Sequence, residues 1–422
     1  MFDIQQGVAI CIFIKNSKII SKQIFHADLY GERDVKYAWL DKHNITNVNW
    51  KEVKPESPDY FFYPVDVLLR NQYETFWKIT DIFPVSSVGV VTGRDELVLG
   101  NTKQELINNL KTFGDRNFSD EEVKKQFNLT DNGHWNVKEA REHFHTVNNW
   151  EKSIVRINYR PFDLRWLYYD DFFLERSRKA AMENILASGN LCLIFTRSIS
   201  GGKQFNHVFC SNNGVLGRFY PDSACITYFS PLYTYKRVSQ FGEYTKQVNI
   251  NPEFLASLRK SLQKEVSPEE TFYYIYAVLY SNQYRAKYLD YLKVDFPRIP
   301  VVKDLKLFDS LVLIGKQLVD LHLMKYKLES NITYSVCGSN VVTSVKFHNG
   351  CVYINKDQFF GGISRDTWDF DIGTCRILQN WLKTRKGKEL TVTEIEFFMQ
   401  IVEVIEKTFG CMHQIGAIPF IE

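Results

Sequence analysis

The sequence lacks the cysteine pairs, long apolar runs and strong charge imbalance that mark several classes of protein. Its eight cysteines are scattered and none forms a CxxC pair, which argues against a zinc knuckle. No apolar run approaches the roughly 18–20 residues of a membrane-spanning helix, and no basic-then-apolar leader opens the chain. We therefore expect a cytoplasmic protein with reduced thiols, with neither a membrane partner nor a metal site.

Several enzyme motifs are also missing. The chain has neither the Asn/Asp-Pro-Pro-Tyr/Phe loop nor the glycine-rich S-adenosylmethionine loop that a methyltransferase acting on exocyclic amines needs. It has no GxxxxGKS/T, GxSxG or HExxH motif. Pro58-Asp59 with Glu122-Val123-Lys124 is a weak nuclease signal, and the HxH of residues 143–145 is a weak metal signal; surface or packing roles explain both better. We expect no catalytic residue and no bound cofactor.

What the chain does have is enough length for two or three domains and a nearly balanced charge. Lys and Arg total 52 against 49 Asp and Glu, a net charge of +3 over 422 residues. Any surface that binds nucleic acid would therefore depend on local clustering of cations. Aromatic residues make up 15%, which suits either thick cores or surfaces that stack on bases.

Periodicity and turn signals predict an α+β (mixed α/β) fold. The apolar run from Val8 to Ile14 predicts a strand buried on both faces, and residues 19–25 predict a returning strand. Residues 101–150 are typical of polar helices, and residues 154–235 of short strands separated by turns. A buried strand this close to the start of the chain needs neighbouring strands, which the sequence does not supply. We therefore expect these residues to belong to a larger α/β domain.

The second half of the chain reads as mainly helical. Ser267-Pro268-Glu269-Glu270 predicts a capped helix start, and leucines between residues 307 and 321 recur with helical spacing. Asn349-Gly350 predicts a hairpin turn. A break at Ser281-Asn282 separates two helices, the second of which is expected to run to Phe296-Pro297; a final helix is expected from Thr393, capped by Glu396, to just before Gly410.

Turns that carry arginine, amide and aromatic side chains are the best candidates for a functional site. Arginine forks suit phosphates and the O6/N7 edge of guanine, and amides suit base edges. The alternative is that the aromatics are buried and the arginines pair with nearby carboxylates such as Asp163, Asp170 and Glu175. The loop 196–207 and the basic turn 383–388 could likewise be plain solvated loops. The DNA-binding candidates are Arg94, Asp95, Arg160, Arg165, Arg176, Arg178, Arg197, Lys203, Gln204 and Asn206.

Several segments, taken in order, resemble the C-terminal region of type ISP restriction–modification enzymes and the related type IIG enzymes. The segments are the start of the chain at residues 2–10, Thr92-Gly93-Arg94-Asp95, the YRPFDLR run at 159–165 with Tyr168-Tyr169, Glu175-Arg176-Ser177-Arg178, Pro231-Leu232-Tyr233, residues 275–288, the DFPRIP run at 295–300, Leu321-His322-Leu323 and residues 381–387. The resemblance covers nearly the whole chain. The YRPFDLR run at 159–165 and the YxxxYxxxLxxDFPRIP pattern at 284–300 are each specific, and together they are hard to explain by chance.

The resemblance implies a double-stranded DNA partner and a methyltransferase domain or subunit. It implies trailing strands of a methyltransferase-like sheet plus a connector at 1–55, an α/β target-recognition part at 56–250, and a helical part with a β-hairpin at 251–422. Such enzymes methylate adenine N6 with S-adenosylmethionine, and the motifs for this would lie before Met1. We therefore expect sequence-specific DNA recognition without catalysis. The alternatives are a remnant that docks a separate methyltransferase chain without binding DNA, and, more weakly, a complete small enzyme.

Overall fold

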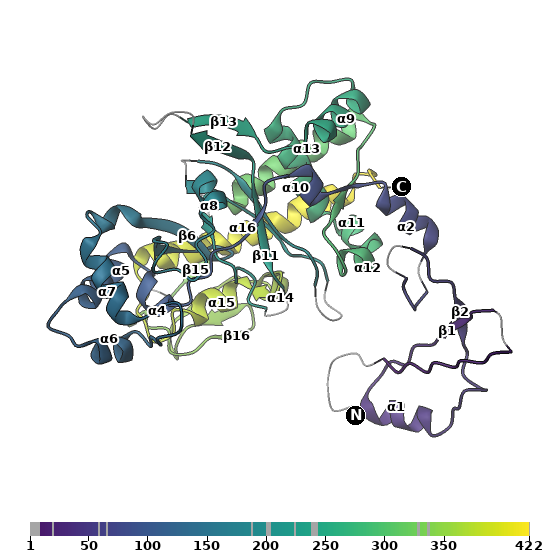
Figure 1. Ribbon diagram of the computed structural model, residues 1–422, viewed down its shortest axis with the longest axis horizontal. Helices are drawn as coiled ribbons and strands as arrows, with labels where there is room; N and C mark the ends of the chain where they lie inside the picture. Colours follow the sequence, from purple (N-terminus) through teal and green to yellow (C-terminus); the bar gives the residue numbers. More distant parts are fainter. Residues whose placement is uncertain are drawn as a thin grey trace. The chain divides into compact units, whose positions relative to one another are not determined.

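The computed structural model describes residues 9–18, 21–57, 60–64, 66–186, 189–199, 204–222, 225–237, 244–326, 330–335 and 338–421 (Figure 1). The chain divides into two compact units, Met1–Thr75 and Phe76–Glu422. Helices and short strands alternate along it, which confirms the α+β class. No helix within these ranges has both the length and the hydropathy of a membrane span. The boundaries expected near residues 55 and 250 stay predictions.

The first unit is small. Its two strands, β1 (Ile24–His26) and β2 (Lys51–Val53), pair antiparallel. Its helices are α1 (Arg33–Leu40) and α2 (Val67–Glu74), and α1 buries none of its residues. Asp66 caps α2, because its carboxylate accepts a hydrogen bond from the N–H of Leu69.

The buried strand predicted for residues 8–14 is wrong over the part that the structure describes. Residues 9–14 form neither helix nor strand, and Ile10, Ile12, Phe13 and Ile14 are exposed. Val8 lies outside the described residues, and of the returning strand predicted at 19–25 only its end is found, within β1. A continuous apolar run forms a buried strand only where neighbours cover both its faces, and no strand in the described ranges pairs with residues 9–14.

Two four-stranded sheets form the first half of the second unit. Their strand orders are β4-β11-β8-β9 and β10-β6-β7-β5. Residues 87–91 link the two sheets, because β4 pairs with β11 while Val90 bridges to Leu216 just after β10. The strands are β4 (Ser87–Val88), β5 (Leu99–Gly100), β6 (Ile154–Arg160), β7 (Asp163–Tyr168), β8 (Cys192–Thr196), β9 (Val208–Ser211), β10 (Gly214–Val215) and β11 (Thr227–Pro231).

Helices pack on the second of these sheets through an aromatic cluster. Tyr168 of β7 is fully buried and meets Phe144 and Phe173 edge-to-face, and Phe113 also contacts Phe173. The helical prediction for residues 101–150 is confirmed. The helices of this half are α3 (Ile79–Ile82), α4 (Asp95–Val98), α5 (Lys103–Gly114), α6 (Asp120–Gln126), α7 (Val137–Thr146), the 3-10 turn η1 (Trp150–Ser153) and α8 (Lys179–Leu186).

Three long helices form the core of the second half: α10 (Pro268–Tyr280), α13 (Leu305–His322) and α16 (Val392–Gly416). The hydroxyl of Tyr276 on α10 donates to Nδ1 of His322 on α13 (2.6 Å). Nε2 of His322 in turn donates to the hydroxyl of Thr408 on α16 (3.0 Å), which itself donates to the carbonyl of Val404. Burial lowers the pKa of His322 to about 3, so the ring is neutral and links all three helices.

Shorter elements complete the fold. The helices are α9 (Pro252–Leu262), α11 (Asn282–Lys287), α12 (Leu289–Leu292), α14 (Arg365–Asp369) and α15 (Ile377–Lys383). A third four-stranded sheet has the order β15 (Thr333–Tyr334), β18 (Phe359–Gly361), β17 (Cys351–Tyr353) and β16 (Lys346–His348). The two-stranded pairs are β3 (Trp77–Lys78) with β14 (Arg298–Ile299), β12 (Tyr233–Arg237) with β13 (Tyr244–Val248), and β19 (Asp371–Ile372) with β20 (Cys375–Arg376).

One of the two predicted capping boxes is confirmed. The Ser267 capping box, the break after Tyr280 and the hairpin turn at Asn349-Gly350 are confirmed. The predicted bounds of two helices are wrong. The helix expected to run to Phe296-Pro297 ends at Leu292. The final helix is capped by Thr391 with Glu394 in place of Thr393 with Glu396, and it continues through Gly410, because packing against α13 outweighs the low helix propensity of one glycine.

Gly315 sets the distance between α10 and α13. A Cβ at this position would overlap the backbone carbonyl of Tyr273. We predict that Gly315→Ala lowers the free energy of unfolding by about 2 kcal/mol in a urea titration, since the helices would have to move apart. Gly410→Ala is the matched control. Nothing lies near its Cβ position, so there the better helix propensity of alanine should stabilise by up to about 1 kcal/mol. Equal effects at both sites would contradict the close-packing argument.

Acid should weaken the three-helix core through His322. In the unfolded chain this histidine takes up a proton near pH 6.5, whereas in the fold its pKa is about 3. Its contribution to stability is therefore complete above pH 6.5 and is lost as the pH falls toward 3, with a slope of up to about 1.4 kcal/mol per pH unit. Replacing His322 with Gln should remove this part of the slope in denaturation curves at pH 7, 6 and 5. The exposed His413→Gln variant should retain it.

Candidate nucleic-acid interface

Two of the predicted motifs, residues 92–95 and 175–178, lie side by side. Val91 and Arg176 exchange two backbone hydrogen bonds of 3.0 Å, and the N–H of Glu175 donates to the carbonyl of Thr92. On the other edge of the same segment, the N–H of Gly217 donates to the carbonyl of Val90 (2.7 Å). These three segments, 90–95, 174–178 and 215–218, are termed the loop cluster. They meet at the junction of the two sheets.

Two glycines allow the loop cluster to pack this closely. A Cβ at Gly89 would overlap the backbone of Leu216, and a Cβ at Gly93 would lie 2.9 Å from the carboxylate of Glu175. Gly93 also has a φ of +68°, in the left-handed region that glycine adopts without strain. The turn predicted from the sequence at 92–95 therefore forms, and contact between backbones fixes its position.

The charged residues of that turn are held by the protein itself. The guanidinium of Arg94 donates to the carbonyl of Phe173 (3.1 Å) and stacks 3.8 Å from the ring centroid of Trp135. Burial lowers the pKa of Arg94. Asp95 accepts a hydrogen bond from the hydroxyl of Thr92. Both side chains stabilise the turn, and their contact with DNA stays a prediction.

Other arginines of the loop cluster are available for a ligand. Arg176 and Arg218 are exposed, and within the described ranges their guanidinium groups have no hydrogen bond, ion pair or aromatic partner. Arg178 has a left-handed backbone (φ 56°), and its Nε is buried without a hydrogen-bond partner. Arg218 is absent from the sequence-based candidates, although Gly217-Arg218 repeats the Gly-Arg pair of residues 93–94 and could have signalled it.

The two arginines of the YRPFDLR run face internal partners. Arg160 donates to the carbonyls of Tyr159 (2.7 Å) and Arg218 (2.5 Å), and Arg165 forms an ion pair with Asp163 (3.2 Å). Both guanidinium groups also stack on the ring of Tyr159, at 4.2 Å and 3.5 Å from its centroid. Their side chains hold β6, β7 and the loop at 215–218 together, which is the structural alternative that the sequence left open.

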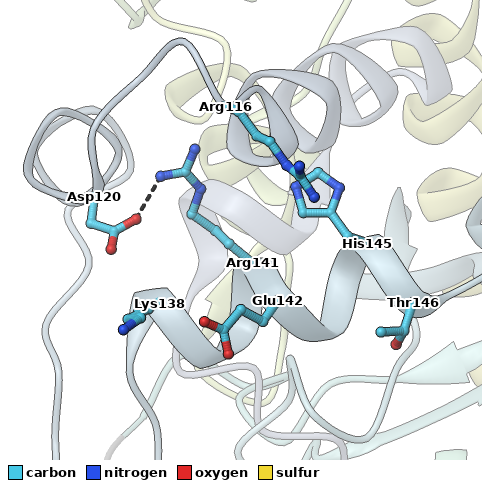
Figure 2. A pocket seen from close by; sticks show the side chains of 7 residues that line it. All are labelled: Arg116, Asp120, Lys138, Arg141, Glu142, His145 and Thr146. Atoms are coloured by element: carbon cyan, nitrogen blue, oxygen red, sulfur yellow. Dashed lines mark hydrogen bonds and ion pairs between the residues drawn. The ribbon is translucent and has the colours of Figure 1, made fainter.

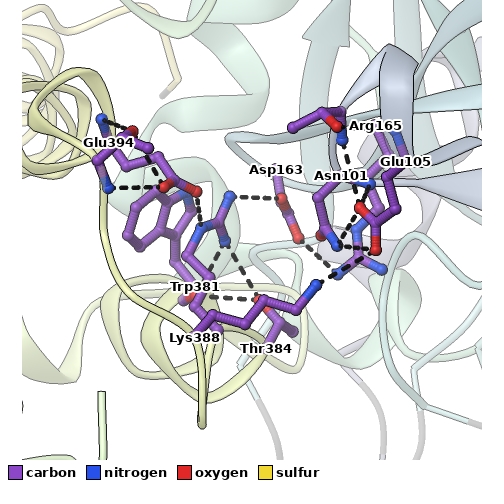
Figure 3. Close-up of polar contacts among 11 residues, drawn as sticks. Asn101, Glu105, Asp163, Arg165, Trp381, Thr384, Lys388 and Glu394 are labelled. Atoms are coloured by element: carbon purple, nitrogen blue, oxygen red, sulfur yellow. Dashed lines mark hydrogen bonds and ion pairs between the residues drawn. The ribbon is translucent and has the colours of Figure 1, made fainter. Parts of the chain in front are cut away.

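Asp163 is the centre of a buried ion-pair network (Figure 3). Its side chain is only 3% exposed, and besides Arg165 it accepts a hydrogen bond from Arg385 (3.3 Å), in the turn after α15. Arg385 in turn pairs with Glu394 of α16 (3.1 Å) and stacks on Trp381 of α15 (3.5 Å to the centroid). The predicted basic turn 383–388 therefore contributes its arginine to the interior, where it ties β7 to the C-terminal helices.

The structure describes both ends of the loop 196–207, and each end is anchored by a side chain. Arg197 is 61% exposed and pairs with Asp295 (3.2 Å), while Asn206 donates through its side-chain amide to Asp371. Gln204 is exposed, and Lys203 lies outside the described residues. Arg197 and Gln204 are thus placed at the surface, whereas Asn206 joins this loop to strand β19.

A shallow hollow at helices α6 and α7 and the loop before α6 carries charges of both signs (Figure 2). Arg141 crosses it to Asp120 (2.5 Å) and also donates to two backbone carbonyls. Of the HxH pair, His145 lines the hollow, while His143 pairs with Asp170 (3.3 Å). Within the described residues no three His, Cys, Asp or Glu side chains gather as a metal site would require. The hollow has no dominant charge that would select an anion.

Removing Arg385 should destabilise the fold sharply. The Asp163 carboxylate would stay buried with one cation fewer, and Glu394 would lose its partner. We predict that Arg385→Ala lowers the free energy of unfolding by about 3 kcal/mol, measured by urea denaturation. Lys386→Ala, in the same turn but exposed, should change it by less than about 0.5 kcal/mol. A small effect of Arg385→Ala would show that the network contributes little to stability.

The chain is similar to one protein family over most of its length. Residues 81–407 match the family described as the Type ISP C-terminal specificity domain. No curated protein matches the chain.

Solved structures share its fold. One is a nuclease-deletion mutant of the Type ISP restriction-modification enzyme LlaGI in complex with a DNA substrate mimic (TM-score 0.66, 21% identity, covering 94% of this chain and 33% of that chain). Another is the ATP-dependent Type ISP restriction-modification enzyme LlaBIII bound to DNA (TM-score 0.67, 19% identity, covering 88% of this chain and 26% of that chain). A third is a DrdV–DNA complex (TM-score 0.69, 19% identity, covering 94% of this chain and 43% of that chain). This chain therefore spans less than half the length of each.

Proposed function

The chain belongs to the Type ISP C-terminal specificity domain family, and we propose that it recognises a short sequence in double-stranded DNA for a restriction–modification enzyme. The observation that carries the proposal is the family match over residues 81–407. The fold shared with three proteins whose structures contain DNA or a DNA mimic supports it.

The loop cluster is the part of the surface that we propose meets the duplex. Arg176 and Arg218 lie on segments that pair with opposite edges of residues 90–91, so their backbones are about 10 Å apart, two strand spacings. A guanidinium fork can bind a phosphate or the O6/N7 edge of guanine. Both forks are free of internal partners within the described ranges. Of the sequence-based candidates, Arg178, Arg197 and Gln204 remain additional contacts in this proposal.

Catalysis would belong to other parts of a larger enzyme. We propose that an adenine-N6 methyltransferase domain or subunit, which binds S-adenosylmethionine, and an endonuclease act beside this chain. The chain itself would need no cofactor. The small share of the LlaGI, LlaBIII and DrdV chains that it covers supports this division of labour. Because its ligand would be DNA inside the cell, we propose that it acts in the cytoplasm.

One observation favours the alternative in which the chain docks a separate methyltransferase. The apolar side chains of residues 9–14 are exposed, with Phe13 at 83%, and a partner could cover them. In that case the chain would co-purify with the methyltransferase and would have no DNA affinity of its own. The two proposals therefore differ in whether the isolated chain binds a duplex.

Fluorescence anisotropy with labelled random-sequence duplexes in a salt series tests the proposal. We expect binding that weakens as salt rises, because each phosphate contact adds about −0.9 to the slope of log K against log salt. Arg176→Ala with Arg218→Ala should weaken binding about ten- to hundredfold and reduce the slope by about 2. Lys125→Ala with Lys356→Ala, which removes two exposed charges elsewhere, is the matched control and should bind as the parent does. No binding by the parent at low salt would overturn the proposal.

A further inference from the structure

Strands β12 and β13 form a ribbon of their own in the second unit (Figure 1). They pair antiparallel over five residues each, from Tyr233 opposite Val248 to Arg237 opposite Tyr244. Among the described residues, no further strand joins either of them. An isolated two-stranded hairpin is at best marginally stable in water, so the rest of the protein has to hold its base.

Side chains from two helices and a turn hold that base. Asn190 bonds both the N–H (3.2 Å) and the carbonyl (2.7 Å) of Tyr233, and Asn184 of α8 accepts from the N–H of Tyr235 (2.7 Å). The hydroxyl of Tyr233 donates to the carboxylate of Glu269 in the first turn of α10. The outer edge of β12 is thus bonded to the core of the unit, while β13 lies on the other side of the ribbon.

Neither face of β13 is buried. All five residues of that strand are exposed, and Tyr244 is exposed to 61%. A strand in a soluble protein commonly has at least one face packed on a core, which this one lacks within the described ranges. Its side chains are Tyr, Thr, Lys, Gln and Val, so the uncovered surface is rich in hydrogen-bonding groups. Such a surface suits a polar partner.

The charged residues of the two paired strands have one sign. Residues 233–237 and 244–248 include three cations and no Asp or Glu. The register places Lys246 opposite Tyr235 on one face and Lys236 opposite Thr245 on the other, so each face has a lysine. The ammonium of Lys246 lies 3.6 Å from the ring centroid of Tyr233, which positions it near the anchored base.

These features match the major groove of double-stranded DNA. The groove is about 12 Å wide and admits a two-stranded ribbon. A ribbon standing between the two phosphate walls directs one lysine toward each wall. We propose, on the basis of the DNA-binding function proposed above, that β12–β13 is a second DNA-contacting element in which Lys236 and Lys246 bind phosphates on opposite sides of a groove.

Removing the two lysines together tests this inference in the full chain. Lys236→Ala with Lys246→Ala should weaken binding to random-sequence duplexes about tenfold or more near 0.1 M salt and reduce the salt slope by about 2. Each single variant should reduce the slope by about 1, because the two lysines meet different phosphates. Lys236→Arg with Lys246→Arg keeps both charges and should retain the parent slope. Far-ultraviolet circular dichroism checks that the fold is intact.

The outcomes separate this inference from the proposed function. If the parent binds DNA and the Lys236→Ala, Lys246→Ala chain binds equally well with an unchanged slope, the ribbon does not touch DNA and the inference is overturned while the proposed function stands. That result would favour a protein strand on the free edge of β13, since backbone pairing is indifferent to these lysines. If the parent itself does not bind, both proposals fall. The Lys125→Ala, Lys356→Ala chain again controls for loss of net charge.

Discussion

The buried carboxylate of Asp163 is the constraint on which the second unit depends. A charge that is taken out of water has to be matched by opposite charge and hydrogen bonds, or the fold does not tolerate it. Arg165 supplies one partner from the same strand, and Arg385 supplies another from the turn between α15 and α16. The sheet and the C-terminal helices therefore have to assemble together, because neither alone satisfies this group.

The arginines of the candidate site fall into two sets, according to whether the protein itself binds their guanidinium groups. Arg94, Arg160 and Arg165 lie in motifs that look suited to nucleic acid, yet each is bound by a carbonyl, a carboxylate or an aromatic ring of the protein. Arg176 and Arg218 of the loop cluster and Lys236 of the β12–β13 ribbon have no such partner within the described ranges, while Lys246 lies over the ring of Tyr233. The first set stabilises the turns and sheets of the second unit, and the second set is the one that we propose contacts DNA.

Local signals in the sequence predicted local structure well. The Ser267 capping box, the leucine repeat of α13 and the Asn349-Gly350 turn each depend on neighbours within a few residues, and each formed as expected. The arginine-bearing turn at 92–95 was also found. Its pairing with residues 175–178 could not be, because backbone contacts between distant segments leave no pattern in either one. The same reason hides the pairing of Asp163 with the distant Arg385, whereas its pairing with the nearby Arg165 was an alternative that the sequence left open. It also accounts for the run at 9–14, which is exposed because no strand in the described ranges pairs with it.

The close backbone contact at Gly89 limits how the loops of the loop cluster can change in length. Two backbones touch there, so the segment at 90–95 cannot slide along the one at 215–218. Extra residues in either loop would have to extend outward into solvent from this crossing point, so that loop tips of different length and chemistry could be carried on an unchanged frame.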